Sequence, residues 1–393
     1  MFGCMKSKIF FISFVVILFV IGDLQQEYPN FFVRYFKYMI FIVPFTYLLV
    51  LKKTNLMVQT FFYPFIFLIF WNVMFSPFSS LLNFRSLVVF IVPLLFFSTN
   101  LVENIYEKSL IKISIPIVIY FLIFKSQSAV NESLYDTLLS MNSSGAESFL
   151  LPFLLGFFAI FYFLINRYKL SFLFLAATLL SAKRSVIIAC IAVILLSFFV
   201  PKKSNKKSYL LLGLLLNFIT IFVLFLFING FFDGYLESFL GVKSIGAFTS
   251  GRFSIYTYVF NNFYDLSLWN KLTGIGYGEI SFYIGNYFNK GAWNSHSEVL
   301  RLMTEIGIIG SFIFITLLYN VRNKNQFLLT FFFNMLMVFT NILTYPVAMF
   351  LYLMMMYYFY NYENNKINKQ VFHKLYVLKY KNRYYKLVST RCK

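Results

Sequence analysis

The chain has 393 residues, of which 60% are hydrophobic and only 12% are charged. A water-soluble domain does not carry so much Phe, Leu and Ile, because it must cover its surface with polar side chains. The composition therefore excludes a soluble enzyme and predicts an all-α, polytopic membrane protein. Membrane topology is sufficient to explain the net charge of +20, and we expect no nucleic-acid partner.

Twelve apolar runs are candidates for membrane-spanning helices, since a bilayer core about 30 Å thick needs roughly 20 apolar residues per helix. About nine lie within residues 1–230 and about three within residues 297–361. They cover residues 9–22, 35–51, 57–76, 86–99, 109–124, 149–165, 169–182, 185–200, 209–230, 297–319, 326–343 and 346–361. Lys6 and Lys8 precede the first run as in a signal peptide, but no small-residue cleavage site follows, so we predict an uncleaved helix.

The distribution of Lys and Arg sets the orientation, because cytoplasmic loops of membrane proteins are enriched in basic residues. With both termini inside, the inner segments hold the "KKSNKK" block at 202–207 and nine basic residues beyond residue 362. Residues 362–393 mix these bases with aromatics, and we expect a cytoplasmic tail that lies on anionic lipid headgroups. Residues 231–296 then form one long periplasmic loop.

One stretch, residues 169–200, is too long for a single crossing. At 1.5 Å per residue its helix would be about 48 Å long. The sequence "SAKRS" at 181–185 interrupts it. We therefore predict two short helices joined at the outer surface, with Lys183 and Arg184 at the joint.

Charged and titratable residues from three segments meet at this predicted outer face. Arg184 ends the first segment, Arg252 closes "TSGR", and Arg301 follows His296 within "NSHSEVLRLMTEIGIIG" at 294–310. Arginine holds phosphate oxygens through paired hydrogen bonds and stays charged when desolvated. A histidine, with an ordinary pKa of about 6.5, accepts a proton from an attacking hydroxyl. The set predicts transfer of a group from a membrane-anchored diphosphate to a hydroxyl, with the arginines stabilising the leaving group.

Structural roles remain open for each of these arginines. Arg184 could anchor a helix end at the membrane surface, and Arg252 could be a solvated charge in a turn. Arg301 and Glu305 are four residues apart and could form a simple helical ion pair. His296 is the strongest candidate, because it stands in a polar stretch just before an apolar helix.

The remaining motifs give weaker signals. We expect Gly274, Gly276 and Gly278 to form a turn that positions neighbouring residues, although a plain loop is an alternative. No predicted strand precedes these glycines, so they do not indicate a dinucleotide-binding site. No metal and no cofactor are expected, because the four Asp residues stand apart and no second outer histidine is present. The exposed aromatics could be sugar subsites or an interfacial belt: Trp269, Tyr277, Tyr283, Tyr287 and Trp293. The cysteines, Cys4, Cys190 and Cys392, have no metal-ligand or disulfide spacing and are interpreted as inert thiols.

The order of these motifs resembles the O-antigen polymerase and O-antigen ligase superfamily. In that family a Ser-Arg helix end is followed by a Gly-Arg in an outer loop and a Gly-x-Gly turn. A histidine then stands eleven residues before a Gly-Ile/Leu-Ile/Leu-Gly, as His296 stands before Gly307 here. Two departures are visible: Ser297 replaces the Asn that commonly follows the histidine, and Lys183 is an extra base in "SAKRS".

The resemblance implies a polytopic glycosyltransferase of the bacterial inner membrane with its active site facing the periplasm. The donor would be an undecaprenyl-diphosphate-linked oligosaccharide, and no metal would be needed. His296 matches the family's acceptor-activating histidine, and Arg184 and Arg252 match its diphosphate-binding arginines. Arg301 is assigned to the diphosphate from proximity alone.

Three activities remain as alternatives. An O-antigen polymerase, which transfers the growing polysaccharide to a lipid-linked repeat unit, is favoured because the outer loops other than 231–296 are short. A chain-length regulator is then a possible partner. An O-antigen ligase would transfer the chain to lipid A core, and a flippase would move the lipid-linked oligosaccharide without chemistry. A flippase is disfavoured because the polar cluster is confined to one face.

Overall fold

The computed structural model describes residues 60–75, 107–124, 150–181, 183–201, 204–240, 252–289, 295–345 and 347–362. Within these ranges the chain forms helices and turns and no strand, which confirms the predicted all-α class. The predicted spans 9–22, 35–51 and 86–99 and the tail beyond residue 362 lie outside the described residues.

The described elements follow the predicted spans closely over much of the chain. Each predicted span from 109–124 to 209–230 coincides with one helix. The elements are η1 (Thr60–Phe62), α3 (Tyr63–Phe75), α5 (Glu107–Phe124), α8 (Leu151–Leu164), α9 (Tyr168–Leu180), α10 (Arg184–Phe199), α11 (Lys206–Ile228), α12 (Asp233–Leu240), α14 (Arg252–Asp265), α15 (Leu268–Thr273), α16 (Glu279–Tyr287), α17 (Glu298–Glu305), α18 (Gly307–Leu318), α19 (Lys324–Phe339) and η4 (Ile342–Thr344), followed by helical residues 347–362.

The centre of the fold is built from α8, α19 and residues 347–362, whose side chains are almost all buried. Aromatic rings dominate the contacts between them. Phe157 on α8 meets Phe332 on α19 edge to face at 5.0 Å, and Phe333 stacks on Tyr352 at 4.3 Å. Such pairs add about 0.5–1.5 kcal/mol each beyond the area that they bury. α10 packs against both α8 and α19, so the first residue of α10 is held by the core.

The outer helices present large apolar side chains to the surroundings. Phe199 at the end of α10 is 81% exposed, and Phe172 and Phe218 on α9 and α11 are also exposed. A helix that is apolar all round is stable only where its environment is apolar too. In the described part of the chain, α11 alone is both long and apolar enough to cross a membrane, and the other apolar helices are shorter. The count of twelve spans stays a prediction.

The two-helix prediction for residues 169–200 is confirmed. α9 ends at Leu180 and α10 begins at Arg184, with Lys183 as its N-cap residue.

The prediction of a single span over 297–319 is wrong. The structure divides this segment into α17 and α18 at Ile306 and Gly307. Gly307 has φ +72°, and a Cβ there would lie 2.3 Å from the carbonyl oxygen of Leu272. The backbone N–H groups of Ile275 and Gly276 donate to the carbonyls of Thr304 and Glu305 at 3.1 and 2.9 Å. Contacts with a distant turn therefore interrupt a helix that the local pattern favours.

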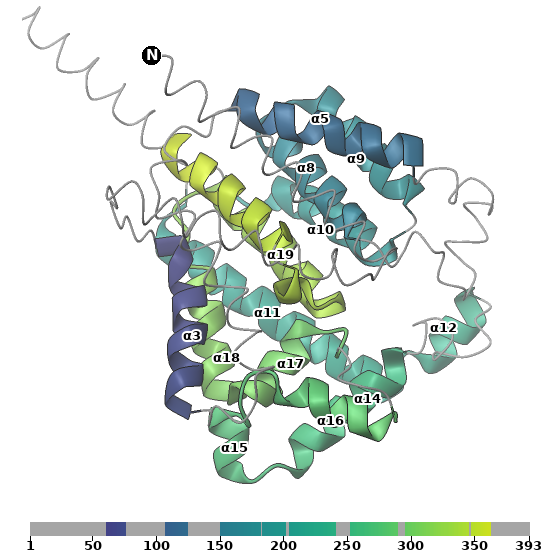
Figure 1. Cartoon of the computed structure of the whole chain (residues 1–393), viewed down its shortest axis with the longest axis vertical. Coiled ribbons are helices and arrows are strands. Elements are labelled where there is room, and N and C mark those ends of the chain that lie inside the picture. The colour runs from purple at the N-terminus through teal and green to yellow at the C-terminus, as the bar shows by residue number, and fades with distance from the viewer. Residues whose placement is uncertain are drawn as a thin grey trace, which may run out of the picture.

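The segment 231–296, predicted as a loop, is largely helical where it is described. It contains α12, α14, α15 and α16. In Figure 1 the last three gather with α17 at the lower end of the view, away from α5, α8 and α9. α14 packs against α11, α16 and α17. This arrangement places the N-terminus of α14 near the N-terminus of α10.

Candidate active site

A cavity of about 420 Å³ lies between α10, α11, α14 and α19. Lys183 and Arg184 line it from the start of α10, and Arg252 and Tyr256 line it from the first turns of α14. The structure thus brings together two of the three predicted arginines, Arg184 and Arg252, which are far apart in the sequence.

The rest of the cavity wall is almost wholly apolar. Ser185 and Thr220 are its remaining polar residues, and six of its apolar ones are Ile188, Ile219, Val223, Phe227, Phe232 and Phe339. In the described part of the chain, no carboxylate forms an ion pair with Arg252. Cations in a cavity with apolar walls favour an anionic ligand, because their charge is screened less there than in bulk water.

The positions of Arg184 and Arg252 within their helices strengthen this preference. Each is the first residue of a helix, α10 with 16 residues and α14 with 14. A helix N-terminus carries a partial positive charge, so a cation there is unfavourable and an anion is stabilised. Two helix N-termini and their arginines therefore converge on the same cavity. Phosphate groups fit such a site, because their oxygens accept from guanidinium and backbone N–H groups alike.

His296 stands next to this cavity in a constrained backbone. The hydroxyl of Tyr256 donates to the carbonyl oxygen of His296 at 3.1 Å. His296 has φ +55°, an uncommon left-handed conformation for a residue other than glycine. The buried serines on either side fix it: Ser295 Oγ bonds Asn341 Oδ1 at 3.0 Å, and Ser297 Oγ caps α17 by accepting from the N–H of Leu300. Strained backbone of this kind is concentrated at functional sites.

Ser297 also gives a structural reason for a departure from the family pattern. Its side chain is the N-cap of α17. Asn and Ser are both among the preferred N-cap residues, because each has a side-chain oxygen that accepts from the first turn. Either residue after the histidine thus stabilises the same helix start.

The environment of His296 keeps the imidazole neutral. Burial is the main cause, followed by the charges of Arg252 and Lys183, and together they lower its pKa from 6.5 to about 4. A neutral imidazole at pH 7 is able to accept a proton from a hydroxyl. Because both cations act on His296, the histidine and the charged end of the cavity form one electrostatic unit.

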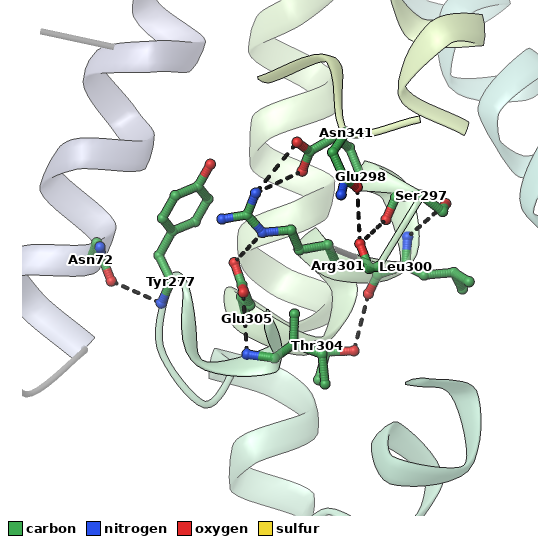
Figure 2. Close-up of polar contacts among 11 residues, drawn as sticks. Asn72, Tyr277, Ser297, Glu298, Leu300, Arg301, Thr304, Glu305 and Asn341 are labelled. Carbon is green, nitrogen blue, oxygen red and sulfur yellow. Dashed lines mark hydrogen bonds and ion pairs between the residues drawn. The ribbon is translucent and has the colours of Figure 1, made fainter. Parts of the chain in front are cut away.

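Arg301, predicted as a third diphosphate ligand, lies elsewhere. It is 2% exposed and is not among the residues that line the cavity. Figure 2 shows its guanidinium between two carboxylates: Nε donates to Glu305 at 2.9 Å, and Nη1 lies 3.4 Å from Glu298. The guanidinium also covers the ring of Tyr277 at 4.4 Å. The helical-pair alternative is therefore confirmed, and the placement beside a diphosphate is corrected, because two carboxylates already neutralise this arginine.

The glycines at 274, 276 and 278 form a turn with positive φ at all three positions, +91°, +112° and +97°. A Cβ on Gly274 would lie 2.2 Å from the carbonyl oxygen of Glu305, so only glycine allows this approach. The turn is held from both sides: Asn72 on α3 accepts from the N–H of Tyr277 at 3.0 Å, and Glu305 accepts from the N–H of Ile280 at 3.3 Å (Figure 2). The turn lies against α17 and does not line the cavity.

The structure separates the aromatic candidates into two groups. Tyr277 is 1% exposed under Arg301, so it is not available to a sugar. Trp269, Tyr283 and Tyr287 are exposed, and Tyr287 stacks on Tyr258 at 4.1 Å. Trp293 lies outside the described residues. The exposed group keeps both interpretations, sugar subsite and interfacial belt.

Sequence reasoning did not assign a role to two residues of the cavity. Tyr256 is four residues after Arg252, a spacing that places both residues on one face of a helix. This spacing could have predicted that Tyr256 lies beside Arg252 in the cavity. Lys183 was noted only as an additional base beside Arg184. Among the described residues, no three His, Cys, Asp or Glu side chains gather where they could hold a metal ion; metal-free chemistry stays a prediction.

Residues 169–315 match the protein-family model described as O-antigen ligase. The match runs from α9 into α18 and so contains Lys183, Arg184, Arg252 and His296. This match supports the resemblance of the chain to the O-antigen polymerase and ligase superfamily. No curated protein and no solved structure matches the chain.

The superfamily is membrane-associated, belongs to bacterial O-antigen synthesis and uses lipid-linked oligosaccharides. Its O-antigen polymerases and ligases share this domain, so the match does not distinguish between the two activities.

Proposed function

We propose that this protein is a glycosyltransferase of the bacterial inner membrane that acts on the periplasmic face. It moves an oligosaccharide from undecaprenyl diphosphate to an acceptor hydroxyl. The observation that carries the proposal is the cavity itself: Arg184 and Arg252 stand at its charged end, His296 is next to that end, and the remaining wall is apolar. Such a cavity suits an amphipathic ligand with a diphosphate head and an isoprenoid chain.

The chemistry divides between the two kinds of side chain. The acceptor oxygen attacks the anomeric carbon of the donor sugar while the bond from that carbon to the phosphate oxygen breaks. His296, neutral at physiological pH, accepts the proton that the acceptor hydroxyl loses. Arg184 and Arg252 bind the diphosphate and stabilise the negative charge on the leaving group. Neither task assigned to these residues needs a bound metal.

Within the superfamily we propose the polymerase activity, in which the acceptor is the next lipid-linked repeat unit. The short predicted outer loops support it. Ligation to lipid A core is the second candidate, and the description of the matching family as O-antigen ligase favours it. Both reactions use the same donor and leave the same lipid diphosphate, so the acceptor alone separates them.

The test is a gene deletion in the native host, complemented with the wild-type protein or with His296→Ala. Surface lipopolysaccharide is then separated on a gel. For a polymerase, the deletion leaves core carrying a single repeat, and only the wild type restores the ladder. Bare core with lipid-linked polymer accumulating in the membrane indicates the ligase. A ladder that survives the deletion would contradict both activities.

A further inference from the structure

Lys183 is a buried cation at the charged end of the cavity, next to Arg184. It is 7% exposed, lines the cavity and stands at the N-cap position of α10. Its ammonium group lies 4.4 Å from the centre of the Phe153 ring on α8. A cation over an aromatic face is stabilised electrostatically by the ring. Because Phe153 is buried in the hydrophobic core, this contact holds the lysine charge beside Arg184 before any ligand binds.

The expected reaction increases the negative charge in this cavity. In the donor, the phosphate next to the sugar is joined to the sugar by an ester bond and to the second phosphate by an anhydride bond, and it carries a single negative charge. When its bond to the sugar breaks, the oxygen left on that phosphate becomes a further ionisable group, whose pKa in a phosphate monoester is about 6. Roughly one additional negative charge therefore develops between the ground state and the products. A group that stabilises this added charge accelerates the reaction without tightening donor binding.

We propose that Lys183 is a third diphosphate-binding residue, and that its charge stabilises the leaving diphosphate more than the bound donor. The inference rests on the proposed glycosyl transfer. The sugar–phosphate bond breaks, its electron pair stays on the phosphate oxygen, and His296 accepts the proton of the acceptor hydroxyl. The two arginines balance the charge of the donor, and Lys183 balances the charge that appears during transfer.

Two variants and a control test this assignment in the purified full-length protein. Lys183→Met removes the charge and keeps an unbranched side chain over Phe153, whereas Lys183→Arg keeps the charge. The control is Lys271→Met: Lys271 also lies over an aromatic ring, 5.1 Å from Tyr264, but it does not line the cavity. Rates are measured at about pH 8, where His296 is neutral in every variant, so a change in its pKa does not affect the comparison.

We expect Lys183→Met to lower kcat about 10- to 100-fold while the Kd of the lipid-linked donor changes less than about threefold. Inorganic pyrophosphate, which resembles the product in charge, should inhibit Lys183→Met about tenfold less strongly than the wild type. Lys183→Arg and Lys271→Met should keep most of the rate. If Lys183→Met does not fold, the test uses Lys183→Arg instead. The inhibition constant of pyrophosphate for Lys183→Arg should stay within about threefold of the wild-type value. A weakening of this inhibition by more than about threefold would overturn the assignment.

The alternative outcomes separate this inference from the proposed function. A normal kcat in Lys183→Met, or a weaker donor Kd with normal kcat, overturns the role of Lys183 in the transition state. Arg252→Ala is measured in the same assay. If Arg252→Ala also leaves donor binding and rate unchanged, the diphosphate site, and with it the proposed function, is wrong. If Arg252→Ala weakens donor binding and Lys183→Met has no effect, only the assignment of Lys183 fails.

Discussion

Arg252 and Arg301 occupy opposite electrostatic environments, although both stand near His296. Arg252 lines an apolar cavity at a helix N-terminus, and no described carboxylate pairs with it. Arg301 is enclosed by Glu298, Glu305 and the ring of Tyr277. A phosphate gains most from a cation whose charge is not already balanced, because a paired arginine must first give up its carboxylate. The comparison therefore supports the proposed diphosphate-binding role of Arg252 and indicates a structural task for Arg301.

That structural task is visible in the contacts of the Arg301 cluster, by which we mean Arg301, Glu298, Glu305 and Tyr277. Glu305 accepts from the backbone after the glycine turn, and Glu298 is the first residue of α17, two positions after His296. Asn72 on α3 holds the backbone of Tyr277. The cluster ties α3, the turn and α17 together, so it stabilises the frame in which His296 keeps its left-handed backbone.

The largest effect should come from His296. Replacing it with Ala removes the proposed proton acceptor, and we expect the transfer rate to fall about 10²- to 10⁴-fold. Donor binding should change little, because in the proposed mechanism Arg184 and Arg252 hold the diphosphate. Tyr256→Phe is the matched control, since it removes only the hydroxyl that bonds the His296 carbonyl; its rate should fall far less. The measurement is a single-turnover assay with labelled lipid-linked donor, and a wild-type rate in His296→Ala would remove the histidine from the chemistry.

A second prediction tests the difference between the two arginines directly. Arg301→Met leaves two buried carboxylates unpaired, which costs about 3–5 kcal/mol of stability. We expect a clearly lower melting temperature in detergent for this variant, but a near-normal temperature for Arg252→Ala. Donor affinity should show the reverse order, with about a 10- to 100-fold loss in Arg252→Ala.

Neutralising the whole cluster gives the control for that comparison. Arg301→Met combined with Glu298→Gln and Glu305→Gln has no unpaired charge, so most of the lost stability should return. If Arg301→Met melts like the wild type and instead loses donor binding, the two environments have been assigned the wrong way round.

The apolar pattern was sufficient to predict the helices of the core and the break at 181–183. The length of a membrane-spanning helix and the basic residues that flank the apolar runs limit where each helix begins and ends. It failed at Gly307, where a continuous apolar run suggested one span. The turn that breaks this run is about thirty residues earlier in the chain, and its contacts with Thr304 and Glu305 are not visible in the local sequence. α14, α15 and α16 were also missed, since short helices with mixed polarity have no periodicity strong enough to distinguish them from loops.

For the site, residue type was more informative than proximity. Arg184, Arg252 and His296 were selected as charged or titratable groups in an apolar chain, and the structure brings them together around one cavity. Arg301 was added because it is near His296 in sequence. Its flanking Glu298 and Glu305, at helical spacings of three and four, were the signal that its charge is used internally.

The smallest predicted effect is a shift in the titration of His296. Burial, Arg252 and Lys183 lower its pKa to about 4, so the free protein should keep a neutral imidazole from pH 7 down to about 5. In the proposed mechanism the neutral imidazole accepts the proton, so activity governed by the free protein should fall only as the pH approaches about 4.

Histidine NMR measures the pKa of His296 directly, because the chain has only two histidines and His373→Gln leaves one signal. Adding pyrophosphate should raise the pKa, since an anion between Arg252 and Lys183 cancels the repulsion that they exert on the imidazolium. A pKa near 6.5 that does not respond to pyrophosphate would show that His296 and the cations of the cavity do not act as one unit.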